Sequence, residues 1–234
     1  MASKKKEVLF ITILLTITIS IFLTIAIILS KNHCELEIDN SIGDKVYAYR
    51  GGKWGFVYWI FRIITEMGYF PGIAIVFIIL LFSSKLDRNS ILFIFGLILA
   101  CTFNCVVKIY FDRERPNELY QWMHDSESSF PSGHSCSAAF IFSYLTYYVF
   151  KSNRKNSIKY LCLGISIILV ISVMVSRIVL GMHYFSDVIA GSMIGIIGFC
   201  LTAYIYMLFE KYEILDDNLI MFKRKKNEEE SINS

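Results

Sequence analysis

The sequence predicts an all-α fold, a polytopic membrane protein with six transmembrane helices. Hydrophobic residues make up 55% of the 234 residues, charged residues make up only 18%, and the mean hydropathy is +0.53. The hydrophobic fraction is higher and the charged fraction is lower than in a typical soluble domain, as expected for an integral membrane protein. The composition also excludes a disordered chain and a disulfide scaffold. A net charge of +3 is too small to suggest a nucleic-acid partner.

The first predicted span covers residues 8–29 and follows Lys4, Lys5 and Lys6. A signal peptide also starts with positive charge, but its apolar region has only about 7–15 residues and ends at a small-residue cleavage site. This run is longer and no clean site of that kind follows it. We therefore interpret it as a membrane helix.

Five further apolar runs complete the predicted topology: residues 69–84, 90–107, 134–150, 158–176 and 187–209. Spanning the hydrocarbon core takes about 20 helical residues, so the shorter runs should extend into their flanks. The result is one membrane-embedded domain over residues 1–234. Its connecting parts are outer loops at 31–68 and 108–133 and a tail at 210–234.

The distribution of basic residues predicts the orientation of these spans. With the N-terminus inside, 14 of the 23 lysines and arginines lie on the inner side, including short basic loops at 85–88 and 151–159. This bias predicts cytoplasmic termini in a multi-pass protein of the plasma membrane. The basic stretch at 223–226 fits a topogenic anchor better than a site for anionic lipid.

The first outer loop contains a possible interfacial helix at residues 54–67. Arg62 and Glu66 are four residues apart there and can pair on one helix face. The alternative is that this stretch is only the start of the second span. All three tryptophans (Trp54, Trp59 and Trp122) fall on the outer side, as in an aromatic belt. Four acidic residues should keep the beginning of the loop in water: Glu35, Glu37, Asp39 and Asp44.

The six cysteines predict neither a disulfide nor a metal site. Five lie in or beside apolar runs, where a thiol behaves as a small hydrophobic group. Cys101 and Cys105 share one helix face, but two thiols do not complete a zinc site. No Asn-x-Ser/Thr sequon occurs, so nothing suggests a glycosylated protein of the secretory pathway.

Three polar segments lie at the outer ends of the last four predicted spans: residues 108–116, 130–134 and 176–187. Charged groups this close to hydrocarbon are costly and usually functional. Asp112 and Glu114 neutralise only part of the positive charge. The surplus indicates a site for a multiply charged anion such as phosphate, which arginine binds through a fork of N–H donors. The cations of this site are Lys108, Arg115 and Arg177.

The second segment predicts a helix N-terminus beside these cations. Pro131, Ser132 and Gly133 precede an apolar run, so a helix should begin there. The first N–H groups of a helix and its positive dipole end favour an anion. Gly133 allows close approach of the backbone, and Ser132 adds a hydroxyl donor.

Two histidines complete the chemistry that the segments allow. His183 and Asp187 are four residues apart, so the carboxylate can bind one ring nitrogen and leave the other free to attack. His134, from another helix, can protonate a leaving oxygen. Taken singly, each piece has an ordinary structural explanation, such as a helix cap or a loop. Together they form a complete phosphoryl-transfer site.

In order, the segments read Lys-x6-Arg-Pro, Pro-Ser-Gly-His and Ser-Arg-x5-His-x3-Asp. This signature resembles that of the type 2 phosphatidic acid phosphatase superfamily, which also includes lipid phosphate phosphatases and vanadium haloperoxidases. All eleven specified positions match, over residues 108–187. The six-span layout extends the resemblance to residues 8–209.

The resemblance implies a role for each matched residue. His183 would form a phosphohistidine, Asp187 would orient it, and His134 would be the general acid. The resemblance implies no metal and no cofactor. The remaining polar positions would hold the phosphoryl oxygens: Lys108, Arg115, Ser132, Gly133 and Arg177.

The resemblance also implies a lipid phosphatase whose site faces the outer leaflet. Such a site reaches a phosphate at headgroup depth while the lipid tails stay in the bilayer. For a small six-span relative, the expected substrates are phosphatidylglycerophosphate, phosphatidate, diacylglycerol pyrophosphate and undecaprenyl pyrophosphate. The short chain and the missing sequons favour a bacterial origin.

Two alternatives remain open at this stage. The same phosphohistidine could pass its phosphoryl group to a lipid or sugar, which would make the protein a phosphotransferase. The protein could also be an inactive lipid-binding relative. The intact set of His134, His183 and Asp187 argues against the second alternative, because a binding protein needs cations but no nucleophile.

Overall fold

The computed structural model describes residues 2–50, 55–84, 88–116 and 127–212, and every regular element within these ranges is an α-helix. The predicted all-α class is therefore confirmed for this part of the chain. The helices are α1 (Ala2–Lys31), α2 (Glu37–Arg50), α3 (Gly55–Glu66), α4 (Phe70–Ser84), α5 (Arg88–Phe111), α6 (Gly133–Lys151), α7 (Asn156–Val179) and α8 (Phe185–Lys211).

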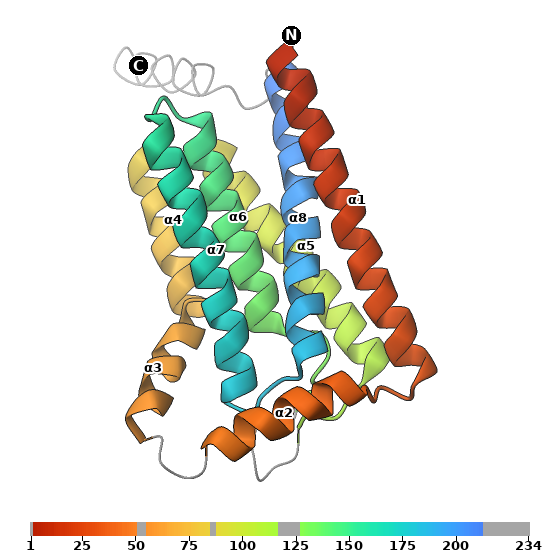
Figure 1. Ribbon diagram of the computed structural model, residues 1–234. Helices are drawn as coiled ribbons and strands as arrows, with labels where there is room; N and C mark the ends of the chain where they lie inside the picture. The colour runs from red at the N-terminus through yellow and green to blue at the C-terminus, as the bar shows by residue number, and fades with distance from the viewer. Residues whose placement is uncertain (1, 51–54, 85–87, 117–126, 213–234) are drawn as a thin grey trace, which may run out of the picture.

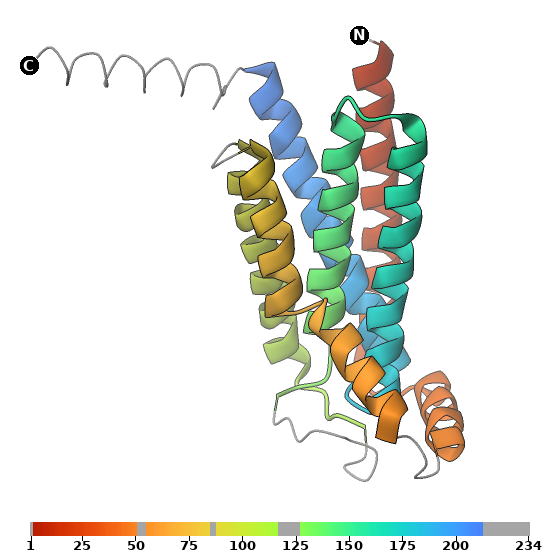
Figure 2. The same ribbon diagram turned by 90° about the vertical axis from the view of Figure 1, so that its left-hand side faces the viewer.

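The long helices form a bundle, and the two short N-terminal helices lie at one end of it. Helices α1, α4, α5, α6, α7 and α8 run along one common direction (Figures 1 and 2). Helix α2 crosses the end of the bundle away from the N-terminus, and α3 leads into α4 at an angle (Figure 1). All the predicted spans coincide with helices of the bundle.

Helix α6 occupies the centre of the bundle. It packs against α5, α7 and α8, and nine of its residues are buried. The rings of Phe93 on α5 and of Phe140 and Tyr144 on α6 lie with centroids 5.5 to 5.9 Å apart. Because its neighbours shield it, α6 can carry polar side chains at a depth where a lipid-facing helix could not.

Among the described residues, four helices are long and apolar enough to cross a membrane: Lys4–Lys31, Arg88–Phe111, Asn156–Val179 and Phe185–Glu210. A fifth crossing results if Tyr58–Glu66 and Pro71–Ile78, which meet at 46°, act as one bent span. The predicted span at 134–150 is a helix, but its serine and threonine residues make it less apolar. The count of six spans therefore stays a prediction.

The first outer loop differs most from its prediction. Residues 37–50 form α2, where the sequence indicated only a polar loop. Asp39 on α2 is 1% exposed, so the prediction that it stays in water is wrong. An ion pair with Arg113 at 2.8 Å stabilises its buried charge. The predicted helix at 54–67 is present as α3, with the Arg62–Glu66 ion pair. Several predictions fall outside the described residues: Trp54, Lys85, Trp122 and the tail at 213–234.

Two glycines of α8 allow α6 to approach closely. A Cβ atom on Gly195 would lie 2.2 Å from the backbone oxygen of Cys136, and one on Gly191 would lie 2.2 Å from that of Ser132. Backbone atoms cannot turn aside as a flexible side chain can, so only glycine fits. The Ser132 N–H also donates to the backbone oxygen of Asp187 at 3.0 Å. Helix α8 therefore fixes the position of the Pro-Ser-Gly-His segment.

Substitution of Gly195 by Ala should destabilise the protein, because the added methyl group forces α6 and α8 apart. Overpacking of this kind typically costs about 1–3 kcal/mol. The matched control is Gly164→Ala on α7, where a Cβ would meet no atom within 4 Å. Thermal unfolding in detergent should show a lower Tm for Gly195→Ala alone. Equal Tm values for the two variants would contradict the close packing.

Candidate active site

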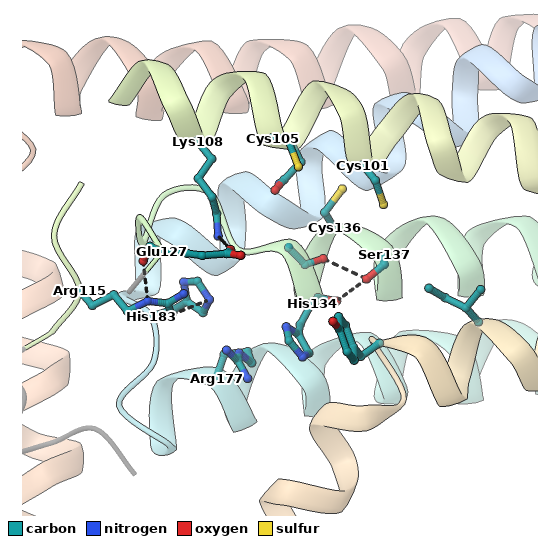
Figure 3. Close-up of a pocket in the computed structure, with 14 residues that line it drawn as sticks. Cys101, Cys105, Lys108, Arg115, Glu127, His134, Cys136, Ser137, Arg177 and His183 are labelled. Atoms are coloured by element: carbon teal, nitrogen blue, oxygen red, sulfur yellow. Dashed lines mark hydrogen bonds and ion pairs between the residues drawn. The ribbon is translucent and has the colours of Figure 1, made fainter. Parts of the chain in front are cut away.

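The predicted polar residues meet at the end of the bundle that α2 crosses, where they surround a cavity of about 280 Å³ (Figures 1 and 3). Asp187 and Ser132 lie behind the cavity wall and are fully buried. Ser132 and Asp187 are distant in sequence from each other, and the close contact of α6 with α8 brings them together. The other six predicted site residues line the cavity: Lys108, Arg115, Gly133, His134, Arg177 and His183.

His183 lies in the short connection between α7 and α8, and its two ring nitrogens have different surroundings. Nδ1 is 2.8 Å from the backbone oxygen of Ser129, which can only accept a hydrogen bond. Nδ1 therefore carries the proton, and Nε2 keeps its lone pair. Nε2 is 3.5 Å from Nη1 of Arg115, and both side chains face the cavity in Figure 3.

Asp187 lies behind His183 and is held by several donors. Its Oδ2 is 3.6 Å from Nδ1 of His183, which is longer than the bond from Nδ1 to the Ser129 carbonyl. The carboxylate accepts hydrogen bonds from the Ser129 hydroxyl and, at 2.8 Å, from the Tyr184 N–H. Arg113 donates to its Oδ1 at 2.6 Å. The nearest acceptor for the imidazole proton is thus Ser129, which the sequence analysis did not single out.

The two arginines of the cavity both donate to neutral groups. Arg115 donates from Nη1 to the backbone oxygen of Met182 at 2.7 Å and from Nε to that of Glu127 at 2.8 Å. Arg177 is buried on α7 and donates to the Thr65 hydroxyl of α3 at 3.3 Å. These contacts hold both guanidinium groups at the cavity, where arginine can bind phosphoryl oxygens through its fork of N–H donors.

Lys108 is paired with an acid at the mouth of the cavity. Its Nζ is 3.1 Å from Oε2 of Glu127, whose side chain is 71% exposed. Ion pairs with an exposed partner contribute little free energy. A phosphate dianion entering the cavity can therefore replace the Glu127 carboxylate at Lys108.

The Pro-Ser-Gly-His segment begins α6, as the sequence predicts. Ser132 is the N-cap, and its hydroxyl accepts from the Ser135 N–H at 3.4 Å and from the Ser135 hydroxyl at 3.1 Å. Ser132 thus caps its own helix and does not line the cavity. The following Gly133 and His134 are the first residues of the helix, so their N–H groups have no intrahelical acceptor.

His134 approaches the cavity from the side opposite the α7–α8 connection. Its ring stacks on that of Tyr69, with centroids 4.9 Å apart and planes 17° apart. Figure 3 shows His134, Arg177 and His183 arranged around the same space. The two imidazoles thus line different parts of one cavity, with Arg177 beside them.

The deeper wall of the cavity comes from α5, and it includes a polar residue that the sequence analysis missed. Asn104 lies one helical turn before Lys108 and is buried, with its side chain at the cavity. Its Nδ2 has no hydrogen-bond partner in the part of the chain that the structure describes. The sequence feature that could have pointed to Asn104 is an amide side chain inside an apolar run, four residues before Lys108. Three cysteines also line the cavity: Cys101 and Cys105 of α5, and Cys136 of α6.

Burial lowers the pKa of His183 from its ordinary value of 6.5 to about 4. The positive charges of Arg177 and Arg115 act in the same direction, whereas Asp187 opposes them. The imidazole is therefore neutral at physiological pH. A neutral imidazole with a free Nε2 is the form that can act as a nucleophile.

The pH dependence of activity should reflect this lowered pKa. The value of kcat/KM should persist as the pH falls through 6.5 and decline toward pH 4, where Nε2 of His183 takes up a proton. The measurement is a pH profile of phosphate release, corrected for the substrate phosphate, whose own second pKa is about 6. An acid limb centred at 6.5 after this correction would contradict a buried, neutral His183.

The sequence also matches the model of a known protein family. Residues 89–211, which are 123 of the 234, match the family model described as the PAP2 superfamily. The chain belongs to the PAP2 superfamily. Together with the four candidate membrane helices, this membership identifies a multi-pass membrane protein whose relatives act on lipid phosphates in the bilayer.

Individual relatives of this PAP2 chain are bacterial. It is 33% identical to phosphatidylglycerophosphatase B of Bacillus subtilis over 103 residues, a match that spans 42% of this chain and about half (49%) of that protein. The fold is similar to the crystal structure of a transmembrane PAP2-type phosphatidylglycerolphosphate phosphatase from Bacillus subtilis. The TM-score is 0.70 with 24% identity, over 81% of this chain and 96% of that one. It is also similar to Aquifex aeolicus LpxE, with a TM-score of 0.60 and 21% identity over 73% of this chain and 97% of that one.

Proposed function

We propose that this protein is a lipid phosphatase that hydrolyses a phosphomonoester or a pyrophosphate on a membrane lipid through a phosphohistidine at His183. One observation carries the proposal. The buried His183 donates from Nδ1 to the Ser129 carbonyl, so its nucleophilic Nε2 is left at a cavity lined by three cations. A site for binding alone would need the cations but not an oriented imidazole.

In the first step, the phosphoryl group binds to Lys108, Arg115, Arg177 and the N-terminus of α6. Nε2 of His183 attacks phosphorus, and the bond from phosphorus to the leaving oxygen breaks. The positive charge that the imidazole gains faces the Ser129 carbonyl and the Asp187 carboxylate. The cations stabilise the charge on the phosphoryl oxygens in the transition state.

His134 supplies the proton for the leaving oxygen. Binding of a phosphate dianion beside it favours the protonated form of this imidazole. After the lipid alcohol or lipid phosphate leaves, His134 is neutral and can accept a proton from water. The water oxygen then attacks phosphorus, the bond to Nε2 breaks, and inorganic phosphate is released with His134 protonated again.

The substrate is a lipid whose phosphate lies at headgroup depth, since the cavity is at one end of the membrane-spanning bundle. The candidates are phosphatidylglycerophosphate, phosphatidate, diacylglycerol pyrophosphate and undecaprenyl pyrophosphate. The name of the Bacillus subtilis phosphatidylglycerophosphate phosphatase, to which the chain is similar in sequence and in fold, favours the first. We place the site on the outer side of a bacterial plasma membrane, with cytoplasmic termini. The bias of lysine and arginine supports this orientation.

A substrate panel tests the proposal. The purified protein, with EDTA and without added metal, should release inorganic phosphate from at least one of the four lipids and less readily from a water-soluble phosphomonoester. Vanadate, which resembles the phosphoryl transition state, should inhibit the reaction. Activity that needs a divalent cation would contradict the site as described. Transfer of labelled phosphate to a lipid or sugar without free phosphate would instead identify a phosphotransferase.

A further inference from the structure

Behind the nucleophile lies a buried network that no part of the three-segment signature explains. Its centre is Arg113, which is 4% exposed and uses all three of its nitrogens. Nε donates to the backbone oxygen of Cys34 at 2.9 Å, and Nη2 donates to Asp39 at 2.8 Å. Nη1 donates to Asp187 at 2.6 Å and to the Ser186 hydroxyl at 2.8 Å. One side chain thus joins the α1–α2 connection, α2 and the start of α8.

Asp39 brings α2 into direct contact with the start of α8. Its Oδ1 accepts from the backbone N–H of Ser186 at 2.8 Å, and its Oδ2 accepts from the Ser186 hydroxyl and from Arg113. Ser186 is in the first turn of α8, where N–H groups have no intrahelical acceptor. Asp39 therefore caps α8 from another helix, and the helix dipole favours its negative charge there.

Arg113 also reaches the nucleophile through its backbone. Its carbonyl oxygen accepts from the Ser129 N–H at 2.7 Å, while its guanidinium holds Asp187. Ser129 in turn gives its hydroxyl hydrogen to Asp187 and accepts the Nδ1 proton of His183 at 2.8 Å. Ser129 and Asp187, the two residues that orient the imidazole, are thus both hydrogen-bonded to Arg113.

The charges of this network suit the reaction proposed above. Two carboxylates and one guanidinium, all buried, leave one net negative charge behind His183. The imidazole is neutral in the free protein and becomes cationic when it is phosphorylated. The excess negative charge of the network then lies behind a positive charge on His183. The network therefore stabilises the phosphohistidine intermediate more than the free protein with its neutral imidazole.

We propose that Asp39 and Arg113 are positioning residues for the His183 nucleophile, so that α2 is part of the active site. The inference rests on the proposed function, because it assigns the network to the step at His183. Neither residue touches the cavity, so neither should affect how phosphate itself is bound. The network should act on the chemical step alone.

The test compares Asp39→Asn with Asp44→Asn. Both residues are aspartates on α2, but Asp44 is exposed and serves as the matched control. The amide that Asp39→Asn introduces keeps an oxygen for the Ser186 N–H and loses the charge that faces Arg113. We expect Asp39→Asn to lower kcat about 10–100-fold, as is typical for groups that orient a catalytic side chain. KM and the inhibition constant of inorganic phosphate should stay at the values of the unmodified protein, and Asp44→Asn should be fully active.

A second variant, Arg113→Lys, keeps the charge but cannot reach the four partners of the guanidinium at once. Arg113→Lys should lower kcat to a similar extent. The double variant Asp39→Asn/Arg113→Lys should have a kcat no lower than that of the less active single variant, because both substitutions break the same network. Full kcat in both single variants would overturn the inference. So would a loss of phosphate affinity in parallel with kcat, because that result indicates general damage to the fold.

The outcome for His183→Ala separates this inference from the proposed function. If His183→Ala remains active, the proposed function fails and the network has no nucleophile to position. If His183→Ala is inactive while Asp39→Asn and Arg113→Lys are fully active, the proposed function stands and only the positioning role is wrong.

Discussion

His183→Ala should abolish phosphate release, with a loss in kcat on the order of 10⁴-fold or more, because the reaction loses the nitrogen that attacks phosphorus. The measurement is release of inorganic phosphate from the best lipid of the panel. The variant leaves the Ser129 carbonyl without its donor, which costs about 1–3 kcal/mol of stability. His183→Gln, whose amide can still donate to that carbonyl, should fold normally and be equally inactive.

A histidine away from the site provides the control for this experiment. His33 lies in the turn after α1 with a φ of 51°, a backbone region that asparagine tolerates. His33→Asn should therefore retain full activity. Substantial turnover in both His183 variants, with folding confirmed by their Tm, would show that the nucleophile is another group.

His134→Ala should have the second largest effect, and its size should depend on the leaving group. With a lipid phosphate, whose alcohol leaves poorly as an anion, loss of the general acid should lower kcat by about 10²–10⁴-fold. With a nitrophenyl phosphate, whose leaving group is stable as an anion, the loss should be much smaller. The measurement is the loss in kcat on the lipid phosphate divided by the loss in kcat on the nitrophenyl phosphate.

Tyr69 provides the control for the ring stacking that His134→Ala removes. Tyr69→Phe keeps an aromatic ring beside His134 and should leave the leaving-group dependence unchanged. An equal loss on both substrates in His134→Ala would contradict the role of general acid. It would indicate that His134 contributes to binding or to packing instead.

The helices of the bundle could be predicted because their sequences are locally unambiguous. The apolar runs at 8–29, 90–107 and 187–209 are long, and each forms a helix that extends a few residues beyond the predicted ends. The segment at 134–150 shows the limit of hydropathy. Its polar residues are tolerated because α5, α7 and α8 surround it, and sequence alone does not give that information.

Helix α2 could not be predicted because its stability depends on contacts distant in sequence. The stretch from Glu37 to Arg50 is polar, and its acidic residues suggested a solvated loop. Asp39 is buried only because Arg113 and Ser186, more than 70 residues away, supply hydrogen bonds and a counter-charge. No local pattern distinguishes Asp39 from Asp44, which is exposed on the same helix.

In the candidate site, the sequence predicted which side chains come together but not which backbone group contacts them. The spacing of His183 and Asp187 placed both residues in one buried cluster, and the three predicted cations line one cavity. The sequence could not show that the Ser129 backbone carbonyl is the nearest acceptor for the His183 proton. A backbone oxygen is present at every position, so only the fold shows which one faces the imidazole.

The most direct test is to trap the phosphorylated protein. A lipid substrate with a labelled terminal phosphate is mixed with the protein, and the reaction is stopped in denaturant without acid, because phosphohistidine is unstable in acid. Peptide mapping should locate the label on His183 at Nε2, since Nδ1 donates to Ser129. In an unquenched sample the label should pass to free inorganic phosphate. Label on another residue or on Nδ1 of His183, or no labelled protein at any time during turnover, would contradict the account.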